Sequence, residues 1–479
     1  MTEPVQSPRT PSADRGTIGA VDQRLSTATL PRVTAGRVPV YDRRSVPRIA
    51  HIGVGAFARA HLGVYADDLL QAGWPAMIRG VSLRSTRAEE QLSPQDGLYA
   101  LAEREPGQER PLRVVGSLKS VRTGADAALD AMSSPDTMLV TLTVTEKGYE
   151  LDARDLSEPD QPRSVPALIT AALARRRGRS APPVVASLDN LLDNGTLLRD
   201  KVLEVAEGTD PELARWIATE VRFPSSVVDR MVPATTADDL DDIARRLGLL
   251  DLAPVTAEHH CSWVISEAEG LPPLGDVGVE VVRDIGAFQR RKLWLLNGPH
   301  SALAYCGLLA GCDSIAAASD HPAVSAFVRR LVADILEVAD LPAAATPQAF
   351  AADALRRFQN PSLGHTCRQV GADGSRKLPQ RLLPVVARRA EGARATGHFA
   401  VVVAAWLAAV AGIPVPGVAL PDLDDPAAAA LRRSGAGGDL RALSYDALQA
   451  HAGSRFASEV AAALEQLTRR GVDVLLEVP

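Results

Sequence analysis

Three polar residues stand among apolar neighbours in the stretch from Lys292 to His300. On an α-helix that begins here, with about 100° per residue, Asn297 lies about 140° and His300 about 80° round from Lys292, so all three can share one side. Apolar surroundings disfavour the ammonium form and lower its pKa, which suits Lys292 to act as a general base near neutral pH. The alternative is an ordinary amphipathic helix, with a Lys that reaches solvent and a hydrogen-bonded His.

A glycine-rich turn indicates what such a base would work with. The stretch 48–52 is typical of a short buried strand, and Gly53-Val-Gly55-Ala-Phe57-Ala58 follows it directly, before a helical pattern that extends to Leu69. In a strand–turn–helix unit these glycines permit a tight turn and a close approach of the backbone to a pyrophosphate, which lies at the helix N-terminus. We therefore predict dinucleotide binding, with contacts from Gly53, Gly55, Ala56 and Phe57.

The second predicted strand, residues 77–83, leaves the choice of dinucleotide open. Such a strand normally ends in an Asp or Glu that binds the adenosine ribose of NAD. Here it ends in Leu83-Arg84-Ser85-Thr86, without an acidic residue. Arg84 and Ser85 are able to contact the 2′-phosphate of NADP, while Arg84 is equally able to stack on adenine or to lie in solvent. NAD is the default expectation and NADP remains open.

The spacing of the elements predicts an α/β fold with two domains. Further strands are expected at 112–115, 137–145 and 183–187, with helical segments such as 167–177 between them. This alternation predicts a Rossmann-like, doubly wound sheet. From about Gly286 the pattern becomes Ala- and Leu-rich and helical. We expect a mobile tail over residues 1–25, a dinucleotide-binding domain over 26–285 and a mainly α-helical substrate and catalytic domain over 286–479.

Polar residues at strand ends and in one cation-rich loop are further candidates for the site. Ligands of doubly wound sheets bind beyond the carboxyl ends of the strands, which favours Asn190 and Lys147, although Asp189-Asn190 also suits a turn or a helix cap. Asp229 and Arg230 interrupt an apolar run, and a structural ion pair is the alternative there. The segment 373–381, with Lys377 and Arg381, is expected to be either a clamp for an anion or polyol or a solvated loop.

Composition excludes several classes of protein. The net charge of −6 argues against a nucleic-acid binder, which needs a basic face. The four cysteines are widely spaced and His259-His260-Cys261 has no partner cluster with zinc spacing, so no metal is expected. The apolar run 399–413 is shorter than the ~20 residues of a membrane span and predicts a core helix. With no signal pattern at the N-terminus, a cytoplasmic enzyme with a small-molecule substrate is expected, in an oligomeric state that the sequence does not give.

Together these stretches resemble the polyol-specific long-chain dehydrogenases, the family that includes mannitol 2-dehydrogenase and fructuronate reductase. The resemblance extends over residues ~25–479 and rests on residues 51–61, 142–149, 189–190, 223–233 and 292–300. It implies an NAD(P)-dependent, metal-independent oxidoreductase that interconverts an acyclic polyol or aldonate with its ketose or ketouronate, either D-mannonate with D-fructuronate or D-mannitol with D-fructose.

The resemblance also implies roles for particular residues. Lys292 would be the general base, Asn190 and Asn297 would hold the carbonyl or alkoxide oxygen, and His300 would orient the substrate. Asp229 and Lys377 would lie near the distant hydroxyl groups. A Lys base with two amide donors performs this chemistry without a Lewis acid.

Some residues depart from the family pattern. Ala58 replaces a usual His, Met231 replaces a usual Ile or Val, and Gln369 stands where mannitol dehydrogenases tend to carry Arg. Gln369 and the segment 373–381 look closer to the fructuronate reductases, which favours a sugar acid slightly. The alternatives are a mannitol 1-phosphate 5-dehydrogenase type of activity, a non-catalytic dinucleotide-binding sensor and, less favoured, a zinc-dependent alcohol dehydrogenase.

Overall fold

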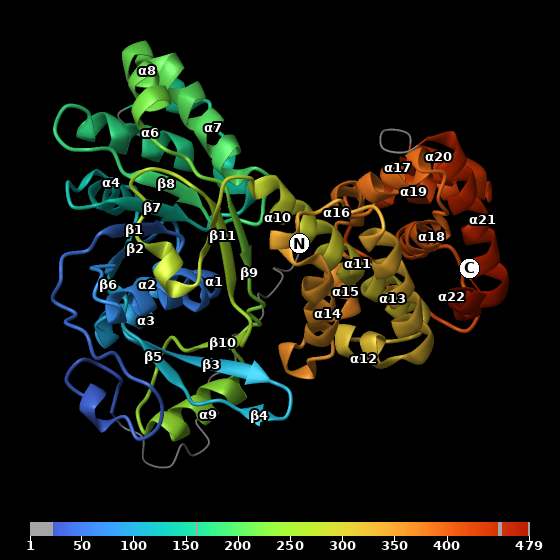
Figure 1. Cartoon of the computed structure of the whole chain (residues 1–479), viewed down its shortest axis with the longest axis horizontal. Coiled ribbons are helices and arrows are strands. Elements are labelled where there is room, and N and C mark those ends of the chain that lie inside the picture. The colour runs from blue at the N-terminus through green and yellow to red at the C-terminus, as the bar shows by residue number, and fades with distance from the viewer. Residues whose placement is uncertain (1–22, 160, 449–452, 478–479) are drawn as a thin grey trace, which may run out of the picture.

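Five parallel strands form the central sheet of the N-terminal part (Figure 1). The computed structural model describes residues 23–159, 161–448 and 453–477. The strands follow the order β6-β2-β1-β7-β8 and span Leu118–Thr123, Ile78–Ser82, Ile49–Ile52, Leu139–Leu142 and Val184–Ser187. Every residue of β1, β7 and β8 is buried, as strands covered on both faces require.

Helices cover both faces of this sheet. One apolar cluster packs the sheet against α2, and the other packs it against α4, α6, α7 and α8. The helices of this part are α1 Ala56–Ala60, α2 Leu62–Gln71, α3 Arg87–Leu92, α4 Ala125–Ser133, α5 Arg154–Ser157, α6 Val165–Arg176, α7 Asn194–Thr209, α8 Pro211–Glu220 and α9 Ala237–Leu247. The predicted Rossmann-like fold is thus confirmed.

One predicted strand belongs to a different sheet. The stretch 112–115 was expected in the central sheet, but β5 (Arg113–Val115) pairs antiparallel with β3 (Tyr99–Glu105), in a second sheet that also contains β4 (Gln108–Glu109) and β10 (Val255–Glu258). The strand at that edge of the central sheet is instead β6, in which Leu118 and Val121 are buried and the other residues are partly or fully exposed. Hydrophobic pattern identifies a strand but not its partner, which explains the error.

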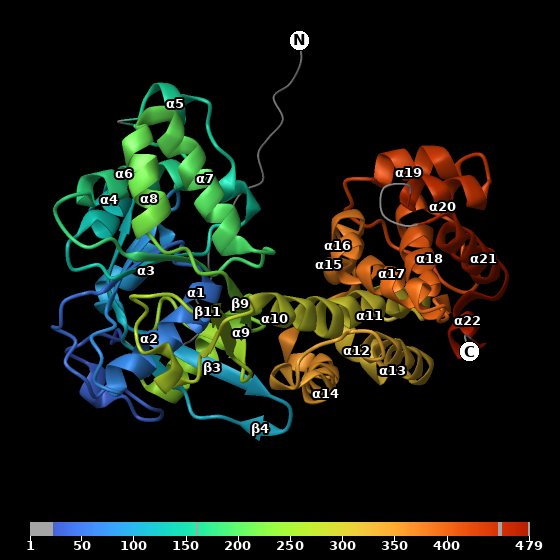
Figure 2. The ribbon, with the colours of Figure 1, turned by 45° about the horizontal axis from the view of Figure 1, so that its top comes forward.

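A third, small sheet faces the C-terminal part. It contains β9 (Ser226–Asp229), β11 (Ser262–Ser266) and β12 (Glu280–Val282), with β9 and β11 antiparallel. Val227 and Val264 of this sheet pack against Ala287 and Phe288 of α10. Figure 2 shows α10 and α11 running from this sheet into the second, helical part of the molecule.

The C-terminal part is helical, as predicted, around one large apolar cluster. Its centre is α18, where residues 398–410 are all buried, so the run 399–413 is indeed a core helix. In the described residues no helix is long and apolar enough to cross a membrane. The helices are α10 Ile285–Lys292, α11 Gly298–Leu309, α12 Ile315–Asp320, α13 Pro322–Leu336, α14 Pro347–Phe358, α15 Cys367–Gly371, α16 Gly374–Arg381, α17 Leu383–Glu391, α18 Gly397–Ala411, α19 Ala428–Gly435, α20 Leu440–Leu448, α21 Ser454–Arg470 and α22 Val474–Glu477.

Two expectations about loops need correction. The cation-rich segment 373–381 is the helix α16, which begins after Asp373 at φ 54° and tolerates Pro379 within its eight residues. The expected tail falls mainly on residues 1–22, which lie outside the described residues. Leu25, at its end, is fully buried and its N–H bonds the carbonyl of Leu250. The turn-forming residues in 373–381 show no helical pattern, so the helix α16 was not predicted. A single Leu, at position 25, has no hydrophobic period around it, so its burial was not predicted either.

A buried ion-pair network joins the two parts of the molecule. Arg357 of α14 donates to both oxygens of Asp229, at 2.6 and 2.9 Å, and to both oxygens of Glu258, at 2.6 and 2.8 Å. Asp229 ends β9 and Glu258 ends β10, and all three side chains are less than a tenth exposed. One guanidinium therefore holds two strands against the helical part.

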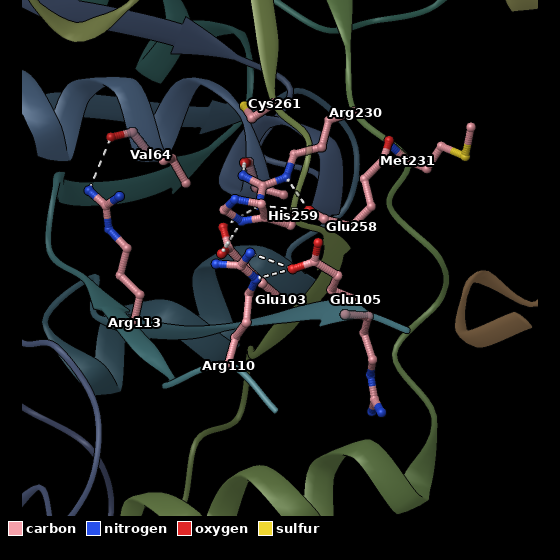
Figure 3. Close-up of polar contacts among 12 residues, drawn as sticks. Val64, Glu103, Glu105, Arg110, Arg113, Arg230, Met231, Glu258, His259 and Cys261 are labelled. Atoms are coloured by element: carbon pink, nitrogen blue, oxygen red, sulfur yellow. Dashed lines mark hydrogen bonds and ion pairs between the residues drawn. The ribbon is translucent and has the colours of Figure 1, made fainter. Parts of the chain in front are cut away.

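Asp229 and Arg230 do not form an ion pair with each other, because the side chain of Arg230 points away from that of Asp229. Its guanidinium donates to the carbonyls of Ala60 and Glu258, at 2.5 and 2.9 Å, and to Glu103 at 2.7 Å (Figure 3). Glu103 also accepts from His259 at 2.9 Å. Because adjacent residues at a strand end point to opposite sides, one side chain reaches the second part while the other stabilises the first.

We predict that Arg357→Met lowers the free energy of unfolding by about 3–5 kcal/mol, because two buried carboxylates lose their common partner. The neighbouring Arg356 is the matched control, since its side chain is 71% exposed and pairs with Asp353 alone among the described residues. Arg356→Met should change stability by less than about 0.5 kcal/mol. Urea unfolding followed by circular dichroism measures both, and equal effects would show that the network does not hold the parts together.

Candidate active site

A turn of π-helix lies at the centre of the candidate site. The helix was expected to begin at Lys292, but α10 begins at Ile285, after Asp284 caps it through Gly286 N–H at 2.9 Å. Residues Leu293–Asn297 then form a π-helical turn that leads directly into α11. The Asp before a helical run was the signal for this earlier start.

Local sequence explains why the helix widens at this point. Gly298 N–H bonds the carbonyl of Leu293, five residues back, and Pro299 has no N–H to offer to the preceding turn. A Cβ on Gly298 would lie 3.0 Å from Leu382 and 3.2 Å from the carbonyl of Arg381, so the backbone packs closely there. Bonds between residues five apart bring Asn297 nearer to the side of Lys292 than the 140° of a regular α-helix.

The amine of Lys292 is held by two acceptors from the N-terminal part. Its Nζ donates to Asn190 Oδ1 at 2.5 Å and to the carbonyl of Val228 at 2.8 Å. Burial lowers the pKa of Lys292 to about 8; nearby Asp229 opposes that shift, while Arg381 and Arg357 add to it. With a pKa of about 8 the amine is mainly protonated near pH 7, and on the order of a tenth of it is neutral and able to act as a general base.

Asp189 anchors the loop that positions Asn190. Its Oδ1 accepts from the N–H groups of Val144 and Thr145, both at 2.9 Å, and its Oδ2 accepts from Tyr149 at 2.8 Å. Helix α7 starts only at Asn194, so Asp189-Asn190 is not a helix cap. The amide of Asn190 projects from a fixed strand end toward Lys292.

His300 lies on the first turn of α11 with a free nitrogen. The ring stacks on Phe358, with centroids 4.9 Å apart, and burial lowers the pKa of His300 to about 3. Its Nε2 is buried and has no hydrogen-bond partner among the described residues. A neutral imidazole with an unused nitrogen is suited to bind a substrate hydroxyl.

Two cavities meet at these residues. The first contains the glycine-rich turn and the second contains the cations of α16, while Asn190, Lys292 and Asn297 line both. The first is also lined by Gly55, Ala56, Phe57, Thr143, Thr145, Asp229 and His300. The second is also lined by Glu146, Gln289, Asp373, Arg376, Lys377, Gln380 and Arg381.

The glycine-rich turn fits a dinucleotide. Gly53 has φ 101°, and a Cβ there would lie 2.2 Å from the carbonyl of Thr143. Gly55 precedes α1 and has no atom within 4 Å of a Cβ position, so its Cα faces open space at the helix N-terminus. A third cavity at this turn extends to Arg84 at the end of β2.

The cations of α16 line the end of the second cavity that this helix forms, and Arg381 also donates to the carbonyl of Asn297 at 3.4 Å. Lys377 donates to the carbonyls of Val370 and Ala372, at 3.3 and 2.5 Å, and burial lowers its pKa. Arg381 donates to Ser301 at 2.9 Å, and burial lowers its pKa to about 10, so it remains charged near neutrality. Together with the exposed Arg376 they make this end of the cavity positive.

Family profiles match the mannitol dehydrogenase Rossmann domain over residues 47–273 and the mannitol dehydrogenase C-terminal domain over residues 284–468. The chain belongs to the mannitol dehydrogenase family. The predicted family and fold class are thereby confirmed.

Individual relatives cover nearly the whole chain. D-mannonate oxidoreductase of Escherichia coli (strain K12) is 35% identical over 469 residues, which are 90% of this chain and 96% of that protein. Mannitol 2-dehydrogenase of Aspergillus clavatus is 32% identical over 91% of this chain and 94% of its own. The solved ternary complex of Pseudomonas fluorescens mannitol 2-dehydrogenase with NAD and D-mannitol has a TM-score of 0.81, with 29% identity over 95% of this chain and 99% of that one. Substrate-free D-sorbitol dehydrogenase has a TM-score of 0.86, with 26% identity over 94% and 99%.

In this family member the structure brings most of the predicted site residues together. Lys292, Asn190, Asn297, His300 and Asp229 line the first cavity, although both oxygens of Asp229 are engaged by Arg357. Lys147 is exposed and lines none of these cavities. Four residues at or beside the site were not predicted from the sequence, because they lie in ordinary amphipathic helices and belong to no recognisable motif. They are Arg357, Gln289, Arg376 and Gln380.

Substituting the two glycines of the turn should separate folding from dinucleotide binding. Gly53→Ala should destabilise the protein by at least about 1–3 kcal/mol and abolish binding, because the residue is forced into a strained backbone against Thr143. Gly55→Ala should leave the melting temperature nearly unchanged and weaken binding, because its methyl group enters only the open cavity. Thermal unfolding and NADH fluorescence titration measure these effects. Unchanged NADH affinity in Gly55→Ala would place the pyrophosphate elsewhere.

Proposed function

We propose that this chain catalyses the NAD(P)-dependent interconversion of an acyclic aldonate and its ketouronate, with D-mannonate and D-fructuronate as the first candidates. The observation that carries the proposal is the Lys292 amine, held where the cavity at the glycine-rich turn meets a cavity lined by the cations of α16. The similarity to D-mannonate oxidoreductase supports the same substrate class.

Lys292 is the general base of this proposal. A neutral amine has two N–H donors and one lone pair, and its donors already bond Asn190 and the carbonyl of Val228. The lone pair is then left to face the cavity and to remove the hydroxyl proton of a secondary alcohol. A dinucleotide whose pyrophosphate is bound at the glycine-rich turn would supply the hydride acceptor.

The two amides stabilise the developing oxyanion. Asn190 uses its oxygen to accept from Lys292, so its NH₂ group is available to the substrate oxygen. The amide of Asn297, one π-turn along from the base, provides a second donor. Fixed donors at the reacting oxygen favour the transition state over the ground state. His300 lines the same cavity and orients the substrate in this proposal.

The positive end of the cavity favours a substrate carboxylate. Arg376, Lys377 and Arg381 line this end, with the carboxylates of Glu146 and Asp373 in the same wall. Gln380 and Asp373 suit hydroxyl groups as well, so a polyol such as D-mannitol is the second candidate, in line with the relatives named mannitol 2-dehydrogenase.

Substrate choice is tested by initial rates with D-fructuronate and D-fructose, each with NADH and NADPH. Fructuronate should be reduced at least about tenfold faster in kcat/KM, because one charge-assisted pair contributes about 1.5–3 kcal/mol. Faster turnover of fructose would make the chain a mannitol dehydrogenase. Turnover of fructose 6-phosphate alone would indicate mannitol 1-phosphate 5-dehydrogenase activity.

Lys292→Ala should lower kcat by about 10²–10⁴-fold while NADH affinity stays within about threefold of wild type. Lys201→Ala, which removes a Lys of α7 paired with Glu204, is the control and should have wild-type activity. An unchanged kcat in Lys292→Ala would refute the role of the base. Dinucleotide binding without turnover of any polyol, aldonate or ketose by the wild type would support a sensor.

The direction of catalysis should set the pH dependence. Alcohol oxidation needs the neutral amine, so its kcat should rise as the pH increases through about 8, the pKa of Lys292. Ketone reduction needs the ammonium, so its kcat should fall over the same range. Because Arg381 contributes to the low pKa, Arg381→Gln should move both inflections to higher pH. Stopped-flow rates across this range give the pH of each inflection. If that pH is the same in Arg381→Gln as in the wild type, another group titrates.

A further inference from the structure

The cavity at the end of β2 contains an arrangement that dinucleotide binding in general does not explain. It is continuous with the glycine-rich turn through Gly53, Gly55 and Ala56, and it extends over the residues that follow β2. In this fold the adenosine ribose lies beyond the end of the second strand. Side chains at this end of the cavity therefore face the ribose hydroxyl groups.

The described residues that line this cavity include three arginines and no Asp or Glu. The arginines are Arg59, Arg84 and Arg87. The next acids along the chain have other partners, since Glu89 pairs with Arg122 at 3.5 Å and Glu90 accepts from Thr86 at 2.7 Å. The free 2′- and 3′-hydroxyls of NAD thus find no carboxylate acceptor here, whereas an anion meets positive charge.

Two of the three arginines are available to a ligand. Arg59 is committed to the protein, because it donates to the carbonyls of Ala253 and Gly55. Arg84 and Arg87 are exposed and form no ion pair within the described part of the chain. Between them, Ser85 accepts from Arg87 N–H at 3.3 Å, which leaves its hydroxyl hydrogen free to donate.

We propose that Arg84, Ser85 and Arg87 form a binding site for the 2′-phosphate of the dinucleotide, so that this chain prefers NADP(H) to NAD(H). Guanidinium groups bind phosphate oxygens with charge-assisted, often paired hydrogen bonds, and the Ser hydroxyl adds a third donor. Leu83, at the first position after β2, also lines this cavity, so no acid stands at the strand end to repel a phosphate. This inference rests on the proposed function only in that a dinucleotide binds at the glycine-rich turn.

The test uses binding alone, so it does not depend on substrate turnover. Isothermal titration calorimetry compares 2′,5′-ADP with 5′-AMP, and fluorescence titration compares NADPH with NADH. Wild type should bind 2′,5′-ADP at least about tenfold more tightly than 5′-AMP, with an advantage that shrinks as salt is raised. Equal affinity for the two nucleotides would overturn the proposal, even if the enzyme turned over its substrate with NADH.

Two single variants and a control test which residues cause 2′,5′-ADP to bind more tightly than 5′-AMP. Arg84→Ala and Arg87→Ala should each weaken 2′,5′-ADP about tenfold while 5′-AMP affinity stays within about twofold. Arg179→Ala, an exposed Arg outside this cavity, should change neither affinity. Equal loss for both nucleotides would assign the arginines to adenine stacking or to folding, and would refute the phosphate site. A preference for 2′,5′-ADP that survives in both variants would refute it as well.

Discussion

The contact on which the site depends is the buried network between Arg357, Asp229 and Glu258. It joins the ends of β9 and β10 to α14 with a single guanidinium and two carboxylates. Residue 228, whose carbonyl accepts a hydrogen bond from Lys292, precedes Asp229 directly, so the same strand end docks the helical part and holds the Lys292 amine. The negative charge of Asp229 also limits how far burial lowers the pKa of Lys292. The docking of the two parts and the pKa of Lys292 therefore depend on one carboxylate.

The π-helical turn brings two polar side chains closer to one side of the helix that connects the two parts of the molecule. A regular α-helix would spread Lys292 and Asn297 around its circumference, whereas bonding between residues five apart draws them together. Gly298 and Pro299 stabilise the irregularity, since one packs closely on Leu382 and the other lacks an N–H. Because Trp294, Leu295 and Leu296 are buried in the helical core, the polar groups are left to face the cavities.

Positive charge is placed at both ends of the ligand path in a protein whose net charge is −6. Arg84 and Arg87 line the cavity at one end, and Arg376, Lys377 and Arg381 line the cavity at the other. Between them lie the glycine-rich turn, the two amides, the imidazole and an amine with a pKa near 8, together with Asp229 and Arg230, whose charges are paired within the protein. Such a distribution of charge suits two ligands that are each anionic at the end away from the other, namely a dinucleotide and an acidic substrate. It also suits a reaction between them in which one proton is transferred.

The sequence by itself determined the Rossmann-like sheet, the glycine-rich turn, the helical second part and the polar residues from Lys292 to His300. These features are local, since they follow from hydrophobic period, glycine at a tight turn and polar residues at fixed spacing. Only the tertiary structure decided that Arg357 pairs with Asp229, that β5 belongs to a second sheet and that 373–381 is a helix beside the site. The first two depend on partners that are distant in the chain, as with Arg357 and Asp229, which lie 128 positions apart, and the third was obscured by turn-forming residues within the segment. Contacts between residues so far apart arise when whole helices and strands pack together, and a local sequence pattern does not predict which ones will pack.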